Sequence, residues 1–163
     1  MAKKRIVVAG VGNVFMQDDA FGVEVVKRLL NKGRREGVEI YDVGIGGLKL
    51  AYDLLRGYDG LILIDASKRG GKPGTLYVIE PKEEEINSDL QQGGAIDPHG
   101  GDPVMVLRFV KALGAWPPKV LIVGCEPATV NEFEMGLSAP VSAAIDDAVK
   151  LVETTIEEIQ NAS

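Results

Sequence analysis

The chain is poor in the two residues that most often build reactive or metal-binding sites. Among its 163 residues it has one cysteine, Cys125, and one histidine, His99. A single cysteine excludes an intramolecular disulfide and a zinc site made of several thiolates, and it suits a reducing cytoplasm. A single histidine excludes the His-Glu-x-x-His zinc proteases and any site that takes two imidazoles from one chain. Any chemistry that the protein performs must therefore depend mainly on carboxylates.

Long apolar runs and an excess of positive charge are also missing. No apolar run approaches the ~18 residues that a membrane-spanning helix needs. The basic and then apolar N-terminus ends at glycine without a signal cleavage pattern, so it predicts a first strand. The formal net charge of −6 would repel the phosphates of a nucleic acid. We therefore expect a cytoplasmic protein without nucleic-acid or membrane partners, built as a single domain over residues 1–163.

Apolar runs alternate with amphipathic segments along the chain. A short turn at 72–75 precedes one of the expected strands and is too short for a parallel crossover, so that strand is expected to run antiparallel at an edge. This order predicts an α/β fold with three layers and a mostly parallel sheet. The expected strands are 5–10, 38–44, 60–67, 75–81 and 119–127, and the expected helices are 20–30, 48–55, 102–114 and a long one from residue 138.

Two of these boundaries carry specific signals. Asp102, Pro103 and Gly114 predict the N-cap, the first position and the end of the helix at 102–114. The residues before this helix, 82–101, are polar and rich in glycine, and a loop of this length suggests a function.

The stretch "GVGNVFMQDDAFG", residues 10–22, begins like a nucleotide-binding glycine loop. Phe15, however, stands where the third glycine of that motif belongs, and Asp18 and Asp19 bring negative charge where a phosphate requires amides. A dinucleotide-binding protein would also need an acid at the end of the second strand, and Asp42 meets this only loosely. The loop is therefore a poor phosphate site, and this alternative would need NAD binding in a titration to support it.

Acidic residues and the histidine follow the expected strands. Asp18 and Asp19 come after the first strand, Asp65 closes the central one, and His99 lies in the loop before the helix at 102–114. Ligands of open α/β sheets bind beyond the carboxyl ends of the strands, and two carboxylates with one imidazole can form a metal site with open positions. Each residue also has a simpler role: a helix cap for one of the acidic pair, a turn for Asp65, and a solvated or structural imidazole for His99.

Five stretches together resemble the hydrogenase maturation endopeptidases. These proteases trim the C-terminus of the large subunit of nickel–iron hydrogenases. The resemblance implies a three-layer α/β/α sandwich on a five-stranded, mostly parallel sheet with one antiparallel strand. The matching stretches occur in order at 10–29 ("GVGNVFMQDDAFGVEVVKRL"), 42–54, 61–67, 97–114 and 123–149, and they cover essentially the whole chain.

The resemblance also implies a site. Relatives form a nickel site from an acid in the first loop, an aspartate at the end of a central strand and a histidine. The matching residues here are Asp19, Asp65 and His99, which leaves Asp18 as the candidate cap. Asp19 and Asp65 are also the candidate catalytic residues, because either could act as the base. The sequence departs from many relatives at Ala20, where they have glycine.

Nickel is expected to arrive with the partner, the hydrogenase large-subunit precursor, which binds it through cysteine thiolates. A weak site without thiolates would complete the coordination of that nickel without capturing free metal first. The protein is expected to act as a monomer. Gly44, Gly46 and Gly47 could let the substrate peptide approach the backbone, or they could simply form a tight strand-to-helix turn. The basic stretch "SKRGGK" at 67–72 either contacts substrate or is a solvated hairpin loop.

Two alternatives remain beside the dinucleotide-binding protein. A cysteine or serine hydrolase could use His99, but the chain lacks the G-x-S-x-G motif, and Cys125 follows a buried strand where inert packing is the rule. A nickel-binding chaperone without catalytic activity could have the same fold, and only a cleavage assay distinguishes it from a protease.

Overall fold

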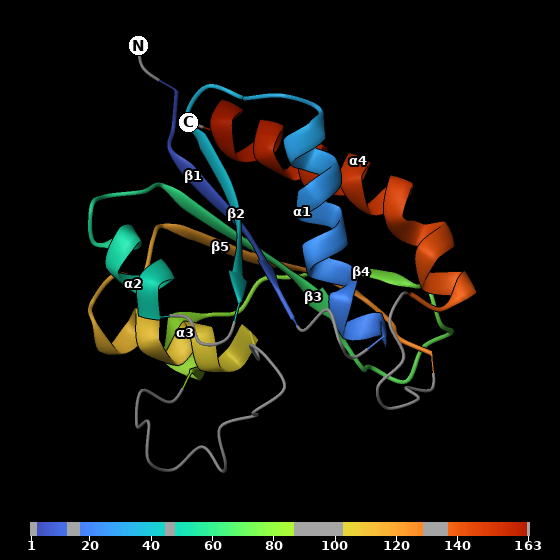
Figure 1. Ribbon diagram of the computed structural model, residues 1–163. Helices are drawn as coiled ribbons and strands as arrows, with labels where there is room; N and C mark the ends of the chain where they lie inside the picture. The colour runs from blue at the N-terminus through green and yellow to red at the C-terminus, as the bar shows by residue number, and fades with distance from the viewer. Residues whose placement is uncertain (1–2, 13–16, 45–47, 87–102, 129–136, 163) are drawn as a thin grey trace.

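The computed structural model describes residues 3–12, 17–44, 48–86, 103–128 and 137–162. Within these residues, five strands form one sheet in the order β2-β1-β3-β5-β4 (Figure 1). Neighbouring strands are parallel except for the edge strand β4, which is antiparallel to β5. The mixed sheet and its antiparallel edge strand confirm the predicted fold class. The strands are β1 (Ile6–Val11), β2 (Val38–Gly44), β3 (Gly60–Ala66), β4 (Leu76–Ile79) and β5 (Lys119–Cys125).

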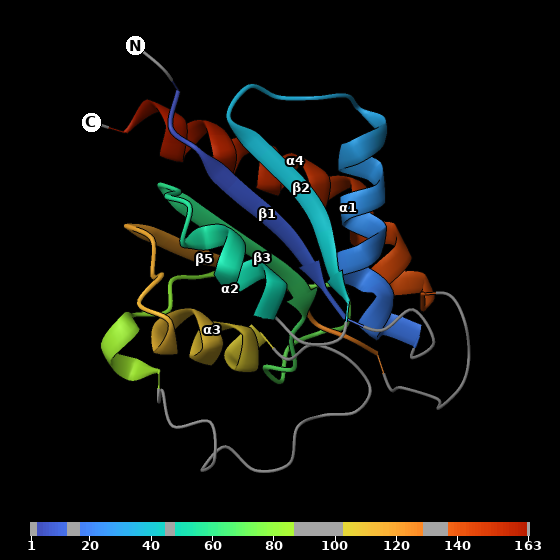
Figure 2. The ribbon, with the colours of Figure 1, turned by 60° about the vertical axis from the view of Figure 1, so that its left-hand side comes forward.

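Helices cover both faces of the sheet and make the three layers. The long helix α4 (Ala139–Asn161) lies beside α1 (Phe21–Asn31) on one face, and α2 (Leu48–Leu54) and α3 (Pro103–Ala112) lie on the other (Figures 1 and 2). Two short 3-10 helices complete the described elements, η1 (Gln17–Ala20) and η2 (Glu83–Glu85). Within the described residues, none of the helices combines the length and the apolar character that a membrane-spanning segment needs.

The central strands are apolar on both faces because helices bury both. In β1, Ile6 and Val8 pack in the core under α1 and α4, whereas Val7 and Ala9 pack in the core under α2 and α3. This alternation follows from the two-residue period of a strand. In β3 the residues Leu61 and Leu63 face α2 and α3, so the same period places Asp65 on that face.

Most element boundaries agree with the sequence expectation to within one or two residues, and the differences have local causes. Strand β4 is shorter than the expected 75–81, because its pairing with β5 ends at Ile79 and Pro81 has no N–H for a ladder. The stretch expected to be a polar loop contains η2 and then Ile86, which is buried in the core under α2 and α3. The remainder of that stretch, with Asp102, lies outside the described residues.

Gly114 stops helix α3, as predicted, just beyond its last residue Ala112. Gly114 has a positive φ of 69°, its N–H donates to the Lys111 carbonyl at 3.0 Å, and the Ala115 N–H donates to the Val110 carbonyl at 3.0 Å. These two bonds form a Schellman motif, which favours glycine because residues with a Cβ are strained at this φ.

Candidate functional site at the carboxyl edge of the sheet

The strand order creates a crevice between β1 and β3. The chain leaves β1 through α1 on one face of the sheet and returns to β3 through α2 on the other face. Two neighbouring strands whose connections leave to opposite faces mark a topological switch point, where open α/β sheets bind their ligands. The acidic pair in η1 follows β1, and Asp65 is the penultimate residue of β3. Both predicted acidic segments therefore lie at this switch point.

Two glycines bring helix α1 against the ends of these strands. A Cβ at Gly10 would overlap the Gly22 carbonyl, and a Cβ at Gly22 would overlap the carbonyls of Ile64 and Val11. Glycine is required because no other residue permits this approach of helix backbone to strand backbone. The glycines that bound the first loop therefore serve helix–sheet packing. They also place η1 against β3, the strand whose penultimate residue is Asp65.

Asp65 lies where the sequence predicted it, at the carboxyl end of the central strand. The residue is 8% exposed, and its backbone is in register with Gly124 of β5. A Cβ at Gly124 would lie 2.8 Å from the Cβ of Ser67, so glycine leaves room for the chain to turn immediately after Asp65. Asp65 therefore places a mostly buried carboxylate at the carboxyl edge of the sheet.

Asp18 does not have the role predicted for it. It was expected to cap α1, but the N-cap of α1 is Ala20, which makes no side-chain capping bond. The Asp18 carboxylate is fully buried and accepts bonds from the Ala128 N–H at 2.8 Å, the Ser138 N–H at 2.7 Å and the Ser138 hydroxyl at 2.8 Å. Three donors satisfy a charge that would otherwise be costly to bury. Asp18 thus ties η1 to the chain beyond β5 and to the start of α4.

The other predicted site residues are only partly covered by the structure. The backbone of Asp19 lies in η1, but its side chain is outside the described residues, as are His99, Gly46 and Gly47. Gly44 ends β2 and pairs with Val11 beyond a register shift. Within the described part of the chain no three histidine, cysteine or acidic residues form a metal-binding group. That part includes Asp65 alone of the three proposed ligand side chains, so their convergence stays a prediction.

Sequence reasoning missed Glu126, which directly follows β5. Its side chain is 5% exposed, and one carboxylate oxygen accepts bonds from the N–H groups of Arg69 and Gly71, both at 2.9 Å, and from the Tyr77 hydroxyl at 2.6 Å. The Tyr77 bond holds the pKa of Glu126 below its ordinary value, and the same bond raises the pKa of Tyr77. An acid at the carboxyl end of a buried strand is the signal that identified Asp65, and the same signal could have identified Glu126.

The environment of Cys125 makes its thiol unreactive. It is fully buried, and burial, followed by the negative charges of Asp18 and Glu126, raises the pKa of its thiol to about 11. A cysteine nucleophile needs a lowered pKa and a positive environment, which is the opposite of this one. The finding supports the prediction that Cys125 is a packing residue.

The sequence matches a family of known proteins. The family model described as hydrogenase maturation protease, HycI, matches residues 23–155. The chain belongs to this family. The Hydrogenase 2 maturation protease of Escherichia coli (strain K12) is 34% identical over 157 residues, which are 94% of this chain and 92% of that protein. The predicted resemblance to hydrogenase maturation proteases is confirmed.

Solved structures of hydrogenase maturation proteases agree with the fold. The hydrogenase maturating endopeptidase HybD from E. coli superposes with a TM-score of 0.76 at 32% identity, covering 94% of this chain and 93% of that one. The hydrogenase 2 maturation peptidase from Thaumarchaeota archaeon SCGC_AB-539-E09 superposes with a TM-score of 0.71 at 33% identity, covering 94% and 99%. The family consists of endopeptidases, so the expected class is a hydrolase that acts on peptide bonds.

Proposed function

We propose that this hydrogenase maturation protease removes the C-terminal extension of a [NiFe]-hydrogenase large-subunit precursor and recognises the nickel that the precursor already holds. The position of Asp65 is the observation that carries the proposal. A carboxylate that is 8% exposed ends the central strand, beside η1 and at the switch point where this fold binds ligands. Family membership supplies the reaction class, and cytoplasmic action on a precursor fits the absence of disulfides.

Asp19, Asp65 and His99 are the proposed ligands of the nickel cargo. Carboxylate and imidazole donors bind first-row transition metals, and thiolates would have to come from the precursor, because Cys125 is buried with a raised pKa. Asp65 lies on the sheet face that α3 covers, and His99 precedes α3 by four residues in sequence. Asp19 or Asp65 is the proposed base that takes a proton from the attacking water. Gly44, Gly46 and Gly47 are proposed to let the substrate peptide approach the backbone.

Cleavage of a defined precursor tests the function. The protein would be incubated with nickel-loaded and with nickel-free large-subunit precursor, and the C-terminus of each product would be measured by mass spectrometry. We expect cleavage of the nickel-loaded form alone, and no rescue when nickel is added to the protease instead. Efficient cleavage of the nickel-free form in the presence of a chelator would show that nickel is not the recognition element. Tight binding of the loaded precursor without cleavage would instead indicate a chaperone.

Substitutions at the proposed ligands give a second prediction. Asp65→Asn keeps the shape of the side chain but removes its charge, and it should lower the processing rate by roughly 100-fold or more, as loss of an acid–base group does. His99→Ala should be similarly severe. Because imidazole binds metal only when neutral, affinity for the loaded precursor should weaken as pH falls through about 6.5. Asp42→Asn is the matched control, since Asp42 is exposed near the carboxyl end of β2. His99→Ala cleaving at the wild-type rate would end the three-ligand proposal.

A further inference from the structure

The connection between β3 and β4 concentrates positive charge next to Asp65. Residues 67–75, here called the basic loop, contain Lys68, Arg69 and Lys72 and are otherwise small or uncharged. Lys68 is three residues beyond Asp65, which limits their Cα separation to roughly 11 Å. The loop therefore lies at the rim of the proposed active site in a chain with 24 acidic and 18 basic side chains.

The basic loop is held in one shape from the inside. Glu126 accepts the N–H groups of Arg69 and Gly71. Both ends of the loop join the chain at the end of β5, because the Ser67 N–H donates to the Cys125 carbonyl and the Gly74 N–H to the Glu126 carbonyl, both at 2.8 Å. A surface ordered in the free protein has less entropy to lose when a partner binds.

Two glycines make this shape possible. A Cβ at Gly71 would overlap the Tyr77 hydroxyl, and one at Gly74 would lie 2.7 Å from the Pro140 carbonyl, where α4 begins. Gly74 also has a positive φ of 90°, which other residues adopt only with strain. The basic loop is therefore an ordered segment that packs against β4 and the start of α4.

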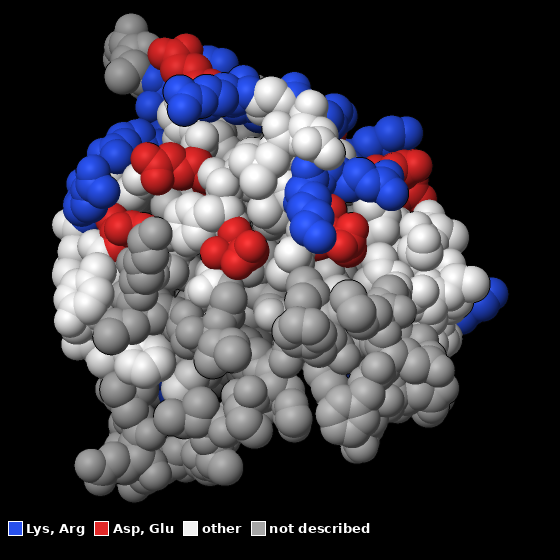
Figure 3. Space-filling model, viewed as in Figure 1, with Lys and Arg blue, Asp and Glu red and all other residues white. Residues whose placement is uncertain are grey.

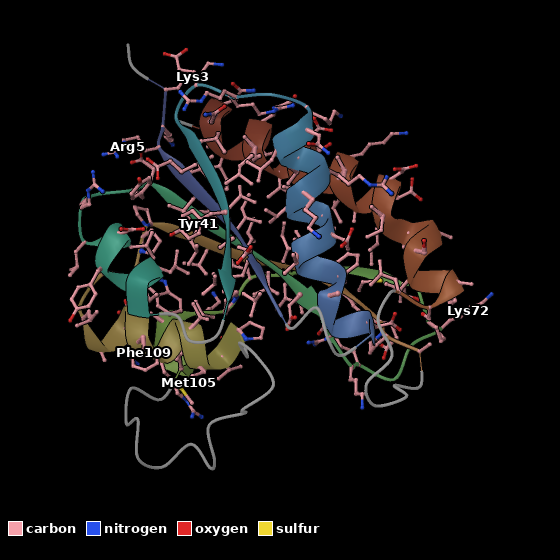
Figure 4. All side chains as sticks on the ribbon, viewed as in Figure 1. Lys3, Arg5, Tyr41, Lys72, Met105 and Phe109 are labelled. Atoms are coloured by element: carbon pink, nitrogen blue, oxygen red, sulfur yellow. The ribbon has the colours of Figure 1, made fainter. Side chains whose placement is uncertain are left out.

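The cations of the basic loop are exposed to solvent, and the described residues provide no acidic partner for them. Lys68, Arg69 and Lys72 are all exposed, and Figure 4 shows Lys72 projecting away from the molecule near the start of α4. The Glu126 carboxylate is turned inward to backbone N–H groups and Tyr77, and the Arg69 guanidinium lies 5.8 Å from the Tyr77 ring centroid. Among the described residues, no carboxylate forms an ion pair with these three side chains.

Some surface cations elsewhere on the protein are paired with acidic side chains. Basic and acidic side chains lie intermixed over the upper part of the face in Figure 3. Described pairs include Arg28 with Asp146 at 2.8 Å and Lys119 with Glu80 at 2.6 Å. A rigid group of unpaired cations in an acidic protein complements negative charge on a partner.

We propose that the basic loop is a docking surface for an acidic segment of the protein substrate. This rests on the proposed function, because it takes the substrate to be the hydrogenase large-subunit precursor. A protein chain bound with its scissile region at Asp65 can continue along the basic loop, from Lys68 next to the site to Lys72 near the start of α4. Its Asp or Glu side chains then meet the ammonium groups of these lysines. Charges at the rim of an interface act on the rate of association and on its salt dependence. The basic loop therefore sets KM for the precursor and leaves kcat unchanged.

Charge reversal tests the docking surface. The full-length double variant Lys68→Glu with Lys72→Glu would be compared with a second double variant, Lys3→Glu with Lys150→Glu. Lys3 and Lys150 are exposed, lie outside the basic loop and form no ion pair with the described residues. The dissociation constant for nickel-loaded precursor would be measured by biolayer interferometry at low and high salt. Cleavage would be followed separately by mass spectrometry. All four substitutions are exposed, and thermal unfolding checks that both variants fold.

The two variants should differ strongly. The loop variant should bind precursor about tenfold more weakly at low salt, with the same kcat. High salt should reduce the difference, because it screens charge pairs exposed to solvent. The control variant should bind within about twofold of the wild type. Equal binding by the two variants, or a loop effect that high salt does not reduce, would overturn the proposal. Because binding is measured without cleavage, an inactive wild type that still shows the loop effect would contradict only the proposed function.

A carbodiimide crosslinker identifies the partner group. It joins a lysine amine to a carboxylate only when the two are in contact. In the complex of wild-type protein with precursor, peptide mapping should find Lys68 or Lys72 joined to an Asp or Glu of the precursor. Crosslinks from Lys3 and Lys150 without any from the basic loop would overturn the proposal.

Discussion

Buried acids at the carboxyl edge of the sheet differ in what satisfies them. Asp18 accepts three hydrogen bonds, two of them from Ser138, and Glu126 also accepts three, two of them from the basic loop. These two carboxylates join segments that are distant in sequence, so their role is to position the chain. Asp65, at the end of β3, is a proposed ligand of the nickel cargo and a candidate base.

Replacement of Asp18 should test its structural role. Asp18→Asn puts an amide where three donors converge and removes the charge that they stabilise. We expect the free energy of unfolding to fall by about 2–4 kcal/mol, since bonds to a buried charged group contribute about 1.5–3 kcal/mol each. The melting temperature should fall by roughly 5–15 °C. Asp147→Asn, on the exposed side of α4, should change it by little. An unchanged Tm in Asp18→Asn would mean that the three bonds do not hold η1.

At the scale of elements, the position of α1 decides where the acidic pair lies. The helix starts against the ends of β1 and β3 because Gly10 and Gly22 leave no side chain between the backbones. Val25, Val26 and Leu29 then pack in the core that α1 shares with α4. Sheet and helix together therefore hold η1 at the switch point.

A single methyl group should disturb this arrangement. At Gly22 the new Cβ of alanine would meet the carbonyl oxygens of Ile64 and Val11, and backbone of a central sheet cannot move aside cheaply. Gly22→Ala should therefore destabilise by about 3 kcal/mol, which exceeds the roughly 1 kcal/mol that alanine gains in helix propensity. Chemical denaturation would measure this. Gly60→Ala is the matched control, because its Cβ would meet side chains and no backbone: Ile159 at 3.3 Å and Ile6 at 3.6 Å. It should cost less than about 1 kcal/mol. Equal effects of the two would contradict the packing argument.

At the scale of the whole molecule, α4 is tied to the connection between α1 and β2. Glu153 accepts bonds from Lys32 at 2.9 Å and Arg35 at 2.8 Å, and its side chain is 16% exposed. The Lys32 bond, with that of Arg35, holds the pKa of Glu153 below its ordinary value of 4.5. These pairs join the C-terminal helix to a segment more than one hundred residues earlier in the chain.

This cluster predicts a pH dependence of stability. A carboxyl group with a lowered pKa in the folded state stabilises the fold above its unfolded pKa, about 4.3. That stabilisation is lost as pH falls through the folded pKa. Wild type should therefore be more stable than Glu153→Gln at pH 7, and the difference should shrink progressively below about pH 4.3. Urea denaturation at several pH values would measure it, with Glu158→Gln as an exposed control. A difference that grows at acid pH would mean that the sign of the shift is wrong.

Local sequence signals predicted the layered architecture, the antiparallel strand β4, the Gly114 stop after α3 and the placement of Asp65 at a strand end. These features depend on local signals, because hydrophobic period, turn residues and caps act over a few residues. The family resemblance was also readable, because its motifs are contiguous stretches. The candidate site could be predicted to the extent that it consists of residues at strand ends.

The hydrogen-bond partners of Asp18 and Glu126 could not be predicted from the sequence. Asp18 and its donor Ser138 are 120 residues apart, and Glu126 is 57 residues from Arg69, so no local pattern could pair them. For this reason the sequence predicted Asp18 as a helix cap and did not indicate Glu126, although Glu126 lies at the end of a strand as Asp65 does. The close contact of Gly22 with Ile64 was hidden for the same reason. Local sequence specifies which residue types end a strand, whereas the partners of those residues are set when distant segments are brought together by the core.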